Sequence, residues 1–276
     1  MNLDSVIESD SVLISALQKF IRRWEIDAAV SVANQLCRPY SDQRWHRLWR
    51  RLNIIATEDI GIAHQGMFLY LSKQEDLIRK TANEEQKIGL TLDTVKTLAS
   101  AKKSRLTDHA FIYLKTELLN GNGSDFSDVS IWDIIQKEHI NEEELLQFVV
   151  WVYLKNNTKF NLKECWEALM SCEVSNPEEM ISLKQAWDTD DCILFLIHAC
   201  LLVTRNYPSD PVWERKVTGS IGQVEIPDYA YDKHTAVGRQ MGRGMKHFIE
   251  VGCLIKNRPK DLVDSYYDRL LLLNWS

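Results

Sequence analysis

The sequence predicts an all-α protein made of two packed multi-helix parts. Apolar residues recur at steps of three and four along most of the chain, and this spacing places them on one face of a helix. The 276 residues include only 11 Gly and 6 Pro, so few helices are interrupted. Hydrophobic residues make up 45% of the chain, which is enough for a sizeable core.

The first part covers residues 1–119. Asp10 or Ser11 can cap a helix that reaches Trp24, and Pro39 ends a second helix over 27–37. A third helix begins at Trp45. Further helices are predicted over 63–80, 91–101 and 107–119.

The third helix, over Trp45–Ala63, carries the most informative stretch. Its apolar face has the helical spacing, and Gly61 can end it because glycine tolerates a positive φ. Glu58 and Asp59 lie close to that end, where the helix dipole disfavours negative charge. The two acids therefore need basic partners or another helix N-terminus. We interpret them as a structural charge network, with a catalytic or metal-binding role as the alternative.

This stretch also resembles a known family. Ile55–Ala63, with the sequence IATEDIGIA, looks like the Ala-Ser-Glu-Asp-Ile-Gly-Leu-Ala segment of RarA/MgsA-type replication-associated recombination ATPases. Ser15–Ala29 resembles that family's helix pair LxKxxRxxDxxAA, and Leu98–Ser104 resembles its LAxAxKS segment. The three pieces occur in the family's order within about residues 10–115.

The resemblance implies a helical region that follows an ATPase core and assembles subunits into a tetramer. The chain has no Gly-x-x-x-x-Gly-Lys-Ser/Thr loop, so a P-loop ATPase is not expected. What the resemblance implies is a role in DNA replication, recombination or repair and a homo-oligomer, with a tetramer expected.

The second part covers residues 125–276 and follows a linker, Asn120–Ser124. Asn141 can cap one of its helices, and Pro177 suits the first turn of another. Asp190 or Asp191 is expected to begin a buried helix. Residues 223–226 are expected to form a short extended piece. The predicted helices cover 131–135, 142–155, 162–172, 177–187, 190–204, 245–251 and 259–273.

Two basic segments are candidates for binding phosphates. Lys102, Lys103 and Arg105 form the first, which could instead be a solvated helix connection or pair with Glu58 and Asp59. The second lies within the glycine-, arginine- and histidine-rich segment 226–252. If it is helical, three cations share one stripe there, and two glycines four residues apart allow another backbone or a ligand to approach closely. The three cations are Arg239, Arg243 and Lys246, and the two glycines are Gly238 and Gly242.

The same segment offers other interpretations. It could be a close-packed helix with a salt-bridged surface. It could also be a hydrolytic or metal site, in which case Asp232, His234, His247 and Glu250 are the candidate catalytic residues. Thr235 could cap its helix.

Composition limits the remaining classes. The six cysteines include no Cys-x-x-Cys pair, so no metal site and no cofactor are predicted, and buried free thiols indicate a reducing compartment. The longest apolar run, Cys192–Val203, is too short to span a bilayer comfortably. We therefore expect a cytoplasmic protein without membrane contact. Because the net charge is -6, nucleic acid could bind only at a local basic patch.

Together these observations predict a non-catalytic homo-oligomer that binds nucleic-acid phosphates or a replication or repair protein. Its DNA binding should weaken steeply with salt, because released counterions drive it. Two alternatives remain open: an enzyme acting on a phosphate-containing substrate through Asp232, His234 and His247, and an adaptor that binds an ATPase in trans.

Overall fold

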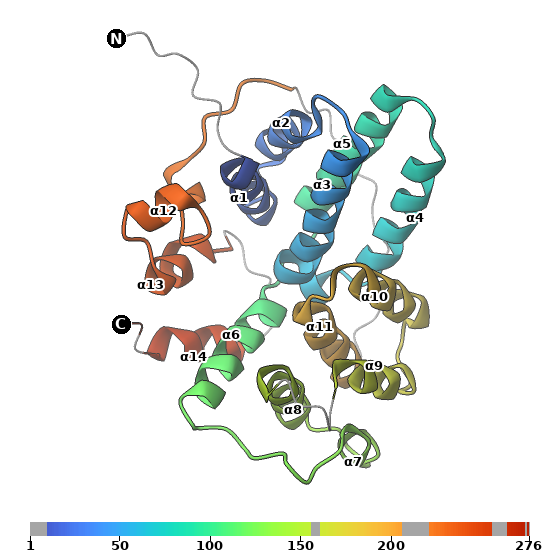
Figure 1. The fold of residues 1–276 in the computed structure, drawn as a ribbon, viewed down its shortest axis with the longest axis vertical. Helices are drawn as coiled ribbons and strands as arrows, with labels where there is room; N and C mark the ends of the chain where they lie inside the picture. The colour runs from blue at the N-terminus through green and yellow to red at the C-terminus, as the bar shows by residue number, and fades with distance from the viewer. Residues whose placement is uncertain (1–9, 156–160, 206–220, 256–263, 274, 276) are drawn as a thin grey trace.

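The computed structural model describes residues 10–155, 161–205, 221–255, 264–273 and 275, and these residues form helices and connecting segments without strands (Figure 1). The all-α prediction is confirmed. The α-helices are α1 (Asp10–Arg22), α2 (Ile26–Cys37), α3 (Asp42–Ile55), α4 (Met67–Lys80), α5 (Glu84–Ser100), α6 (Leu106–Leu119), α7 (Ile131–Ile135), α8 (Glu142–Lys155), α9 (Leu162–Met170), α10 (Pro177–Asp190), α11 (Ile193–Thr204), α12 (Ala236–Gln240), α13 (Met245–His247) and α14 (Ser265–Leu272).

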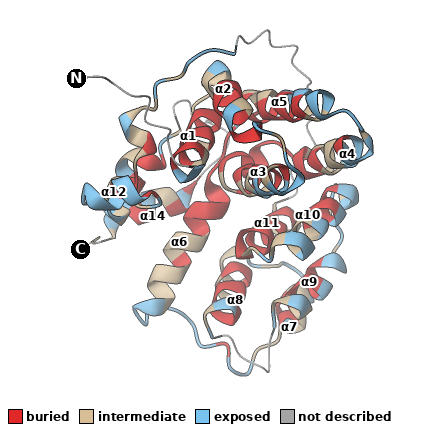
Figure 2. Cartoon of the chain, turned by 45° about the horizontal axis from the view of Figure 1, so that its top comes forward, coloured by how far each residue is buried: buried red, intermediate tan, exposed pale blue. Residues whose placement is uncertain are grey.

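One hydrophobic core runs through both predicted parts. It is continuous from α1 to α11 and includes Tyr266 of α14, and α6 packs against α8, α11 and α14 (Figure 2). The linker 120–124 follows α6 as predicted, but the helices on its two sides share this core. Among the described helices, none combines the length and apolarity needed to cross a bilayer.

The predicted third helix is divided into three segments. α3 begins after Ser41, whose side chain accepts a hydrogen bond from the Arg44 amide. At its end the helix widens into η1 (Ala56–Ile60), a π-helical turn, and then tightens into η2 (Gly61–Ala63), a 3₁₀ turn. Gly61 has a φ of 50°, so it ends the π turn in the conformation that glycine was predicted to supply.

Local capping explains most of the other boundaries. Asn83 caps α5 at Glu84, so this helix starts well before the predicted residue 91. Asn141 accepts a hydrogen bond from the Glu144 amide, and Pro177 occupies the first turn of α10, both as predicted.

Three predictions in the second part need correction or qualification. Asp191 does not begin α11; it ends α10 in a left-handed conformation, and Cys192 precedes α11. Residues 223–226 lie in a connecting segment and form neither a helix nor a strand, so the predicted extended piece is not part of a sheet. Of the predicted helix 259–273, residues up to 263 lie outside the described part, and Ser265–Leu272 is helical.

The segment 226–252 is a compact succession of short turns instead of one helix. It contains η3 (Asp228–Ala230), α12, α13 and a second π-helical turn, η4 (Phe248–Gly252). Thr235 caps α12 by accepting a hydrogen bond from the Gly238 amide at 3.0 Å. Gly242 then takes a φ of 71° and interrupts the helix.

Candidate functional site

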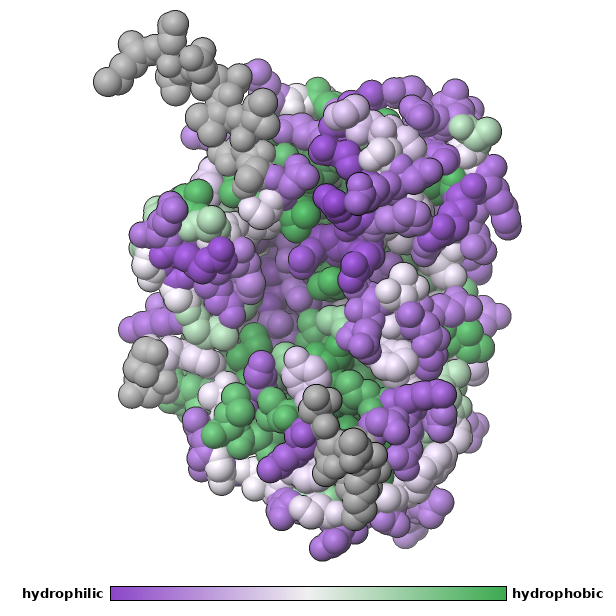
Figure 3. All heavy atoms as spheres, in the orientation of Figure 1, coloured by the Kyte–Doolittle hydropathy of each residue, from purple (hydrophilic) through white to green (hydrophobic). Residues whose placement is uncertain are grey.

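A cavity of about 500 Å³ opens between α1, α6 and the segment 232–248. η1 and α11 each add one side chain to its wall. Seen from the face in Figure 3, the molecule is hollowed near its centre, with hydrophilic residues on one side of the hollow and hydrophobic residues on the other. The cavity is therefore an amphipathic pocket of the size that holds small molecules.

α1 supplies one polar stripe to this pocket. Its lining residues recur at helical spacing, so they share a face. They are Ser11, Ile14, Ser15, Gln18, Lys19 and Arg22. α6 faces it with a second stripe at the same spacing: Asp108, Phe111, Ile112, Lys115, Thr116 and Leu119. Two helix faces of mixed polarity thus form opposite walls.

A buried ion pair joins α1 to the segment 232–248. Lys19 Nζ lies 2.7 Å from Asp232 Oδ2 and donates a hydrogen bond to Ser15 Oγ at 2.7 Å. Ser15 in turn donates to the Ala230 carbonyl at 2.8 Å. Burial lowers the pKa of Lys19 to about 8, although the charge of Asp232 opposes this shift. The pair fixes the segment 232–248 against α1.

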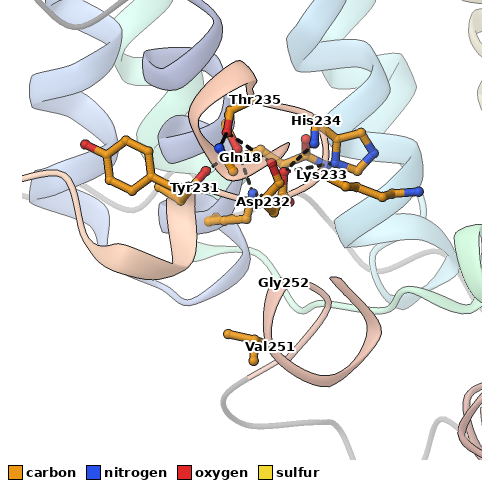
Figure 4. A network of polar contacts seen from close by, with 12 residues as sticks. Gln18, Tyr231, Asp232, Lys233, His234, Thr235, Val251 and Gly252 are labelled. Carbon is orange, nitrogen blue, oxygen red and sulfur yellow. Dashed lines mark hydrogen bonds and ion pairs between the residues drawn. The ribbon is translucent and has the colours of Figure 1, made fainter. Parts of the chain in front are cut away.

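Asp232 also orients His234, and Figure 4 shows this contact. Oδ1 of Asp232 accepts the His234 amide at 2.9 Å and lies 3.1 Å from His234 Nδ1. Burial alone would raise the pKa of Asp232, but hydrogen bonds from His234 and the charge of Lys19 lower it overall. The His234 ring packs edge-on against Phe248 and is 55% exposed. An aspartate that holds Nδ1 leaves Nε2 free to accept or donate a proton.

The floor of the pocket rests on a buried charge network centred on Asp59. Arg22 Nε donates to Asp59 Oδ1 at 2.7 Å, and Arg105 donates both to Asp59 and to Asp108. Gln18 Nε2 donates to Asp59 Oδ2 at 3.0 Å. Burial alone would raise the pKa of Asp59, but the two arginines outweigh it and lower the pKa. Asp59 thus has the basic partners that the sequence required.

Glu58 faces the pocket from the same π turn. It is half-buried, and Gln18 Nε2 donates to its Oε2. Burial raises the pKa of Glu58, and the nearby charge of Asp108 raises it further. A carboxyl group whose pKa is raised toward neutrality can exchange protons with a ligand. The neighbouring acids 58 and 59 therefore have opposite pKa shifts, because Asp59 lies between two arginines.

Three cations in the pocket wall are not neutralised by any ion pair among the described residues. They are Arg51 of α3, Lys115 of α6 and Lys233. Lys233 Nζ is 3.3 Å from Met245 Sδ and 5.0 Å from the Phe248 ring centroid, and burial lowers its pKa. Ile14, Phe111 and Leu194 contribute to the apolar wall.

The first predicted basic segment is not a surface patch. Lys102 is exposed, but Lys103 and Arg105 are fully buried. Lys103 Nζ donates to the Leu98, Ala99 and Ala101 carbonyls at the end of α5, and Arg105 pairs with Asp59 and Asp108. The prediction that Lys103 and Arg105 contact nucleic-acid phosphates is therefore corrected. Lys103 already binds the carbonyls at the end of α5, and Arg105 already binds two carboxylates.

The predicted stripe of Arg239, Arg243 and Lys246 does not form, because Gly242 breaks the helix between them. Arg239 donates to the Lys233 carbonyl at 3.1 Å. Arg243 donates to the Asp228 and Tyr231 carbonyls and to the Asp228 carboxylate, each at 2.6 to 2.7 Å. Lys246 is exposed. Two of the three cations thus hold the segment's own turns together.

The sequence predicts that another backbone or a ligand can approach Gly238 closely, and the structure places the Asp232 backbone against it. A Cβ at Gly238 would lie 1.9 Å from the Asp232 carbonyl oxygen, so only glycine fits. Of the four alternative catalytic residues, Asp232 and His234 meet at the pocket wall, whereas His247 and Glu250 do not line it.

Sequence reasoning missed the pocket's main cations. Lys19 and Arg22 could have been noticed, because together with Ser15 they form a polar stripe at steps of four and three on a helix whose other faces are apolar. Arg51, Lys115 and Lys233 carry no such signal, because only the tertiary fold brings them together. One potential metal-ligand group also escaped prediction: Asp108, His109 and Cys253.

The chain matches no known protein family, no curated protein and no solved structure in comparisons of all three kinds. The resemblance to RarA/MgsA-type ATPases therefore stays a prediction.

Proposed function

We propose that the protein binds a small organic anion, bearing a phosphate or carboxylate group, in the pocket between α1 and α6. The observation that carries this proposal is the charge of the wall. Five lining residues are Lys or Arg and three are Asp or Glu, which leaves two surplus positive charges with the histidine neutral. Arg51, Lys115 and Lys233, which have no ion pair among the described residues, supply donors, and the apolar wall accommodates the rest of the molecule.

The test is a thermal-shift screen of phosphorylated and carboxylated small molecules, followed by calorimetric titration of each hit. Lys115→Met and Lys233→Met each remove one charge-assisted hydrogen bond, so the dissociation constant should rise about 10- to 100-fold. Lys80→Met is the matched control, because Lys80 is exposed at the end of α4 and lies outside the pocket lining. Equal affinity of all three variants, or no hit in the screen, would reject the proposal.

The second candidate function is acid–base catalysis on the bound anion, favoured by the Asp232–His234 contact of 3.1 Å. In this proposal His234 Nε2 exchanges a proton with the substrate, and Asp232 fixes the ring. His234→Gln should then abolish turnover while the calorimetric affinity changes little. A variant that keeps full turnover would exclude this role and leave the binding function intact.

Nucleic-acid binding and homo-oligomer formation stay proposals that the same protein can test. Light scattering with and without single- and double-stranded DNA, at low and moderate salt, measures both. A tetramer that gains mass with DNA only at low salt supports them. A monomer indifferent to DNA rejects them. An ATPase that co-purifies with the protein, without DNA binding, supports the adaptor alternative.

A further inference from the structure

A cluster of three potential metal ligands lies behind the pocket. Asp108 and His109 are consecutive in the first turn of α6, and Cys253 follows η4 directly. One donor atom from each side chain lies within 4.8 Å of the other two, and all three residues are buried. Carboxylate, imidazole and thiolate are the three side-chain ligands that zinc uses.

The histidine is held in an orientation typical of a metal ligand. Its Nδ1 lies 2.6 Å from Asp264 Oδ2, and its ring packs against Tyr267 at 4.9 Å between centroids. Asp264 is itself fixed, because Oδ1 caps α14 by accepting the Tyr267 amide at 3.0 Å. Metal-binding histidines commonly place one nitrogen on a carboxylate in this way, which directs the other nitrogen to the metal.

The other nitrogen, Nε2 of His109, is buried and has no hydrogen-bond partner among the described residues. His109 as a whole is 1% exposed. Buried polar atoms nearly always have a hydrogen-bond partner, so a buried nitrogen without one indicates a place for a ligand. Because Asp264 occupies Nδ1, Nε2 is the nitrogen that remains for a metal.

Acidic groups lie around the cluster. Asp264 lies on His109, and Asp59 shares Arg105 with Asp108. Arg105 and Lys233 are the nearby cations. When Cys253 binds a metal it releases its proton to solvent, and the thiolate offsets one of the two positive charges of a divalent ion.

We propose that Asp108, His109 Nε2 and Cys253 Sγ bind a divalent, thiophilic metal ion such as Zn²⁺. Zinc ligands at their usual bond lengths of about 2.0 to 2.3 Å lie roughly 3.3 to 3.8 Å apart, so the cluster contracts by about 1 Å around the ion. Asp108 also lines the pocket, so water from the pocket would be the fourth ligand. This site does not depend on the proposed anion-binding function.

Cobalt(II) tests the proposal, because a thiolate bound to Co²⁺ gives a near-ultraviolet charge-transfer band and tetrahedral coordination gives strong visible bands. The purified, reduced, metal-free chain is titrated with Co²⁺ alone. The expected result is both bands saturating at one equivalent and bleaching when Zn²⁺ displaces the cobalt. A chain that shows no saturating charge-transfer band overturns the proposal.

Two variants assign the bands to this site. Cys253→Ser should lose the charge-transfer band, whereas Cys37→Ser should keep it, because Cys37 is a buried thiol in α2 and outside the cluster. A band that survives in Cys253→Ser, or disappears in Cys37→Ser, overturns the assignment.

Asp264→Asn provides a second test that still works if Cys253→Ser fails to fold, because it keeps all three proposed ligands. Losing the carboxylate on Nδ1 should weaken cobalt binding about 10- to 100-fold while both bands persist. Circular dichroism without metal checks that this variant is folded. Unchanged affinity in folded Asp264→Asn would reject His109 as a ligand.

Discussion

Asp59 connects three regions of the chain that are distant in sequence. Its carboxylate accepts hydrogen bonds from Arg22 of α1 and from Arg105 next to α6, and its carbonyl accepts the Ser104 amide at 3.0 Å. Arg22 extends the network to the Gly252 carbonyl at the end of η4. Arg22 and Arg105 both pair with Asp59, and Arg105 also pairs with Asp108, so removing one member leaves a buried charge without its partner.

Asp59→Ala should therefore destabilise the fold by about 3–5 kcal/mol, because it leaves two buried arginines without their shared partner. Urea unfolding followed by tryptophan fluorescence measures the loss. The control is Arg38→Ala, which breaks a fully exposed pair with Glu85 and should change stability far less. Similar losses for the two variants would contradict the expectation.

Glu58 should make the free energy of unfolding decrease as pH rises. Burial and Asp108 raise its pKa in the folded chain, whereas the unfolded value is about 4.3. The folded state therefore holds a proton that the unfolded state has lost, and this contribution to the free energy of unfolding declines as pH rises from about 4.3 through the folded pKa. Arg22 and Arg105 oppose the shift but do not cancel it.

Glu58→Gln should flatten that slope, because glutamine does not titrate. The measurement is the free energy of urea unfolding at several pH values between 4 and 8 for both proteins. If the two curves stay parallel, Glu58 is not the group responsible.

At the scale of elements, the helix positions could largely be predicted and the breaks only partly. Gly61 was recognisable as a stop because it follows a complete apolar stripe, but nothing in the residues before it distinguished a π turn from an α-helix. The sequence places Gly242 inside a helix, whereas in the structure it interrupts one. Two glycines at helical spacing are consistent both with close packing and with a broken helix, so the spacing alone does not decide. The early start of α5 at Asn83 was missed because the residues after it are polar.

Gly61→Ala tests the element that carries Glu58 and Asp59. Alanine at a φ of 50° is strained, and its Cβ would lie 3.1 Å from the Ser104 carbonyl oxygen, so a loss of about 1–3 kcal/mol is expected. Gly89→Ala is the matched control. It lies inside α5 with open space around a Cβ, and alanine should stabilise the helix there by up to about 1 kcal/mol. The two stabilities, measured by thermal unfolding, should shift in opposite directions.

At the scale of the whole molecule, the candidate site could not be derived from the sequence. Lys19 and Asp232 are 213 positions apart, and no local pattern shows that they touch. The run from Lys102 to Arg105 had the composition of a surface patch, yet its burial is possible because Lys103 satisfies a helix end and Arg105 satisfies two carboxylates. Burial of charge depends on partners, and these become visible only in three dimensions.

The shared core predicts that the chain unfolds in a single transition. Its buried cluster is continuous across the linker 120–124, and α6 packs against helices on the far side of that linker. Urea curves from tryptophan fluorescence and far-ultraviolet circular dichroism should therefore coincide. Two separated midpoints would instead favour two independent units, divided as 1–119 and 125–276.

The two π-helical turns in the described part of the chain lie at the site: η1 presents Glu58 and Asp59, and η4 presents Phe248 and precedes Cys253. A π turn holds one residue more than an α turn, so it is equivalent to a one-residue insertion in an α-helix. Deleting that residue would allow the turn to close as an α turn, which presents its side chains in different directions. The positions of Glu58, Asp59 and Cys253 thus depend on the number of residues in these turns as well as on their identity, and a single-codon deletion in η1 or η4 would disturb the site.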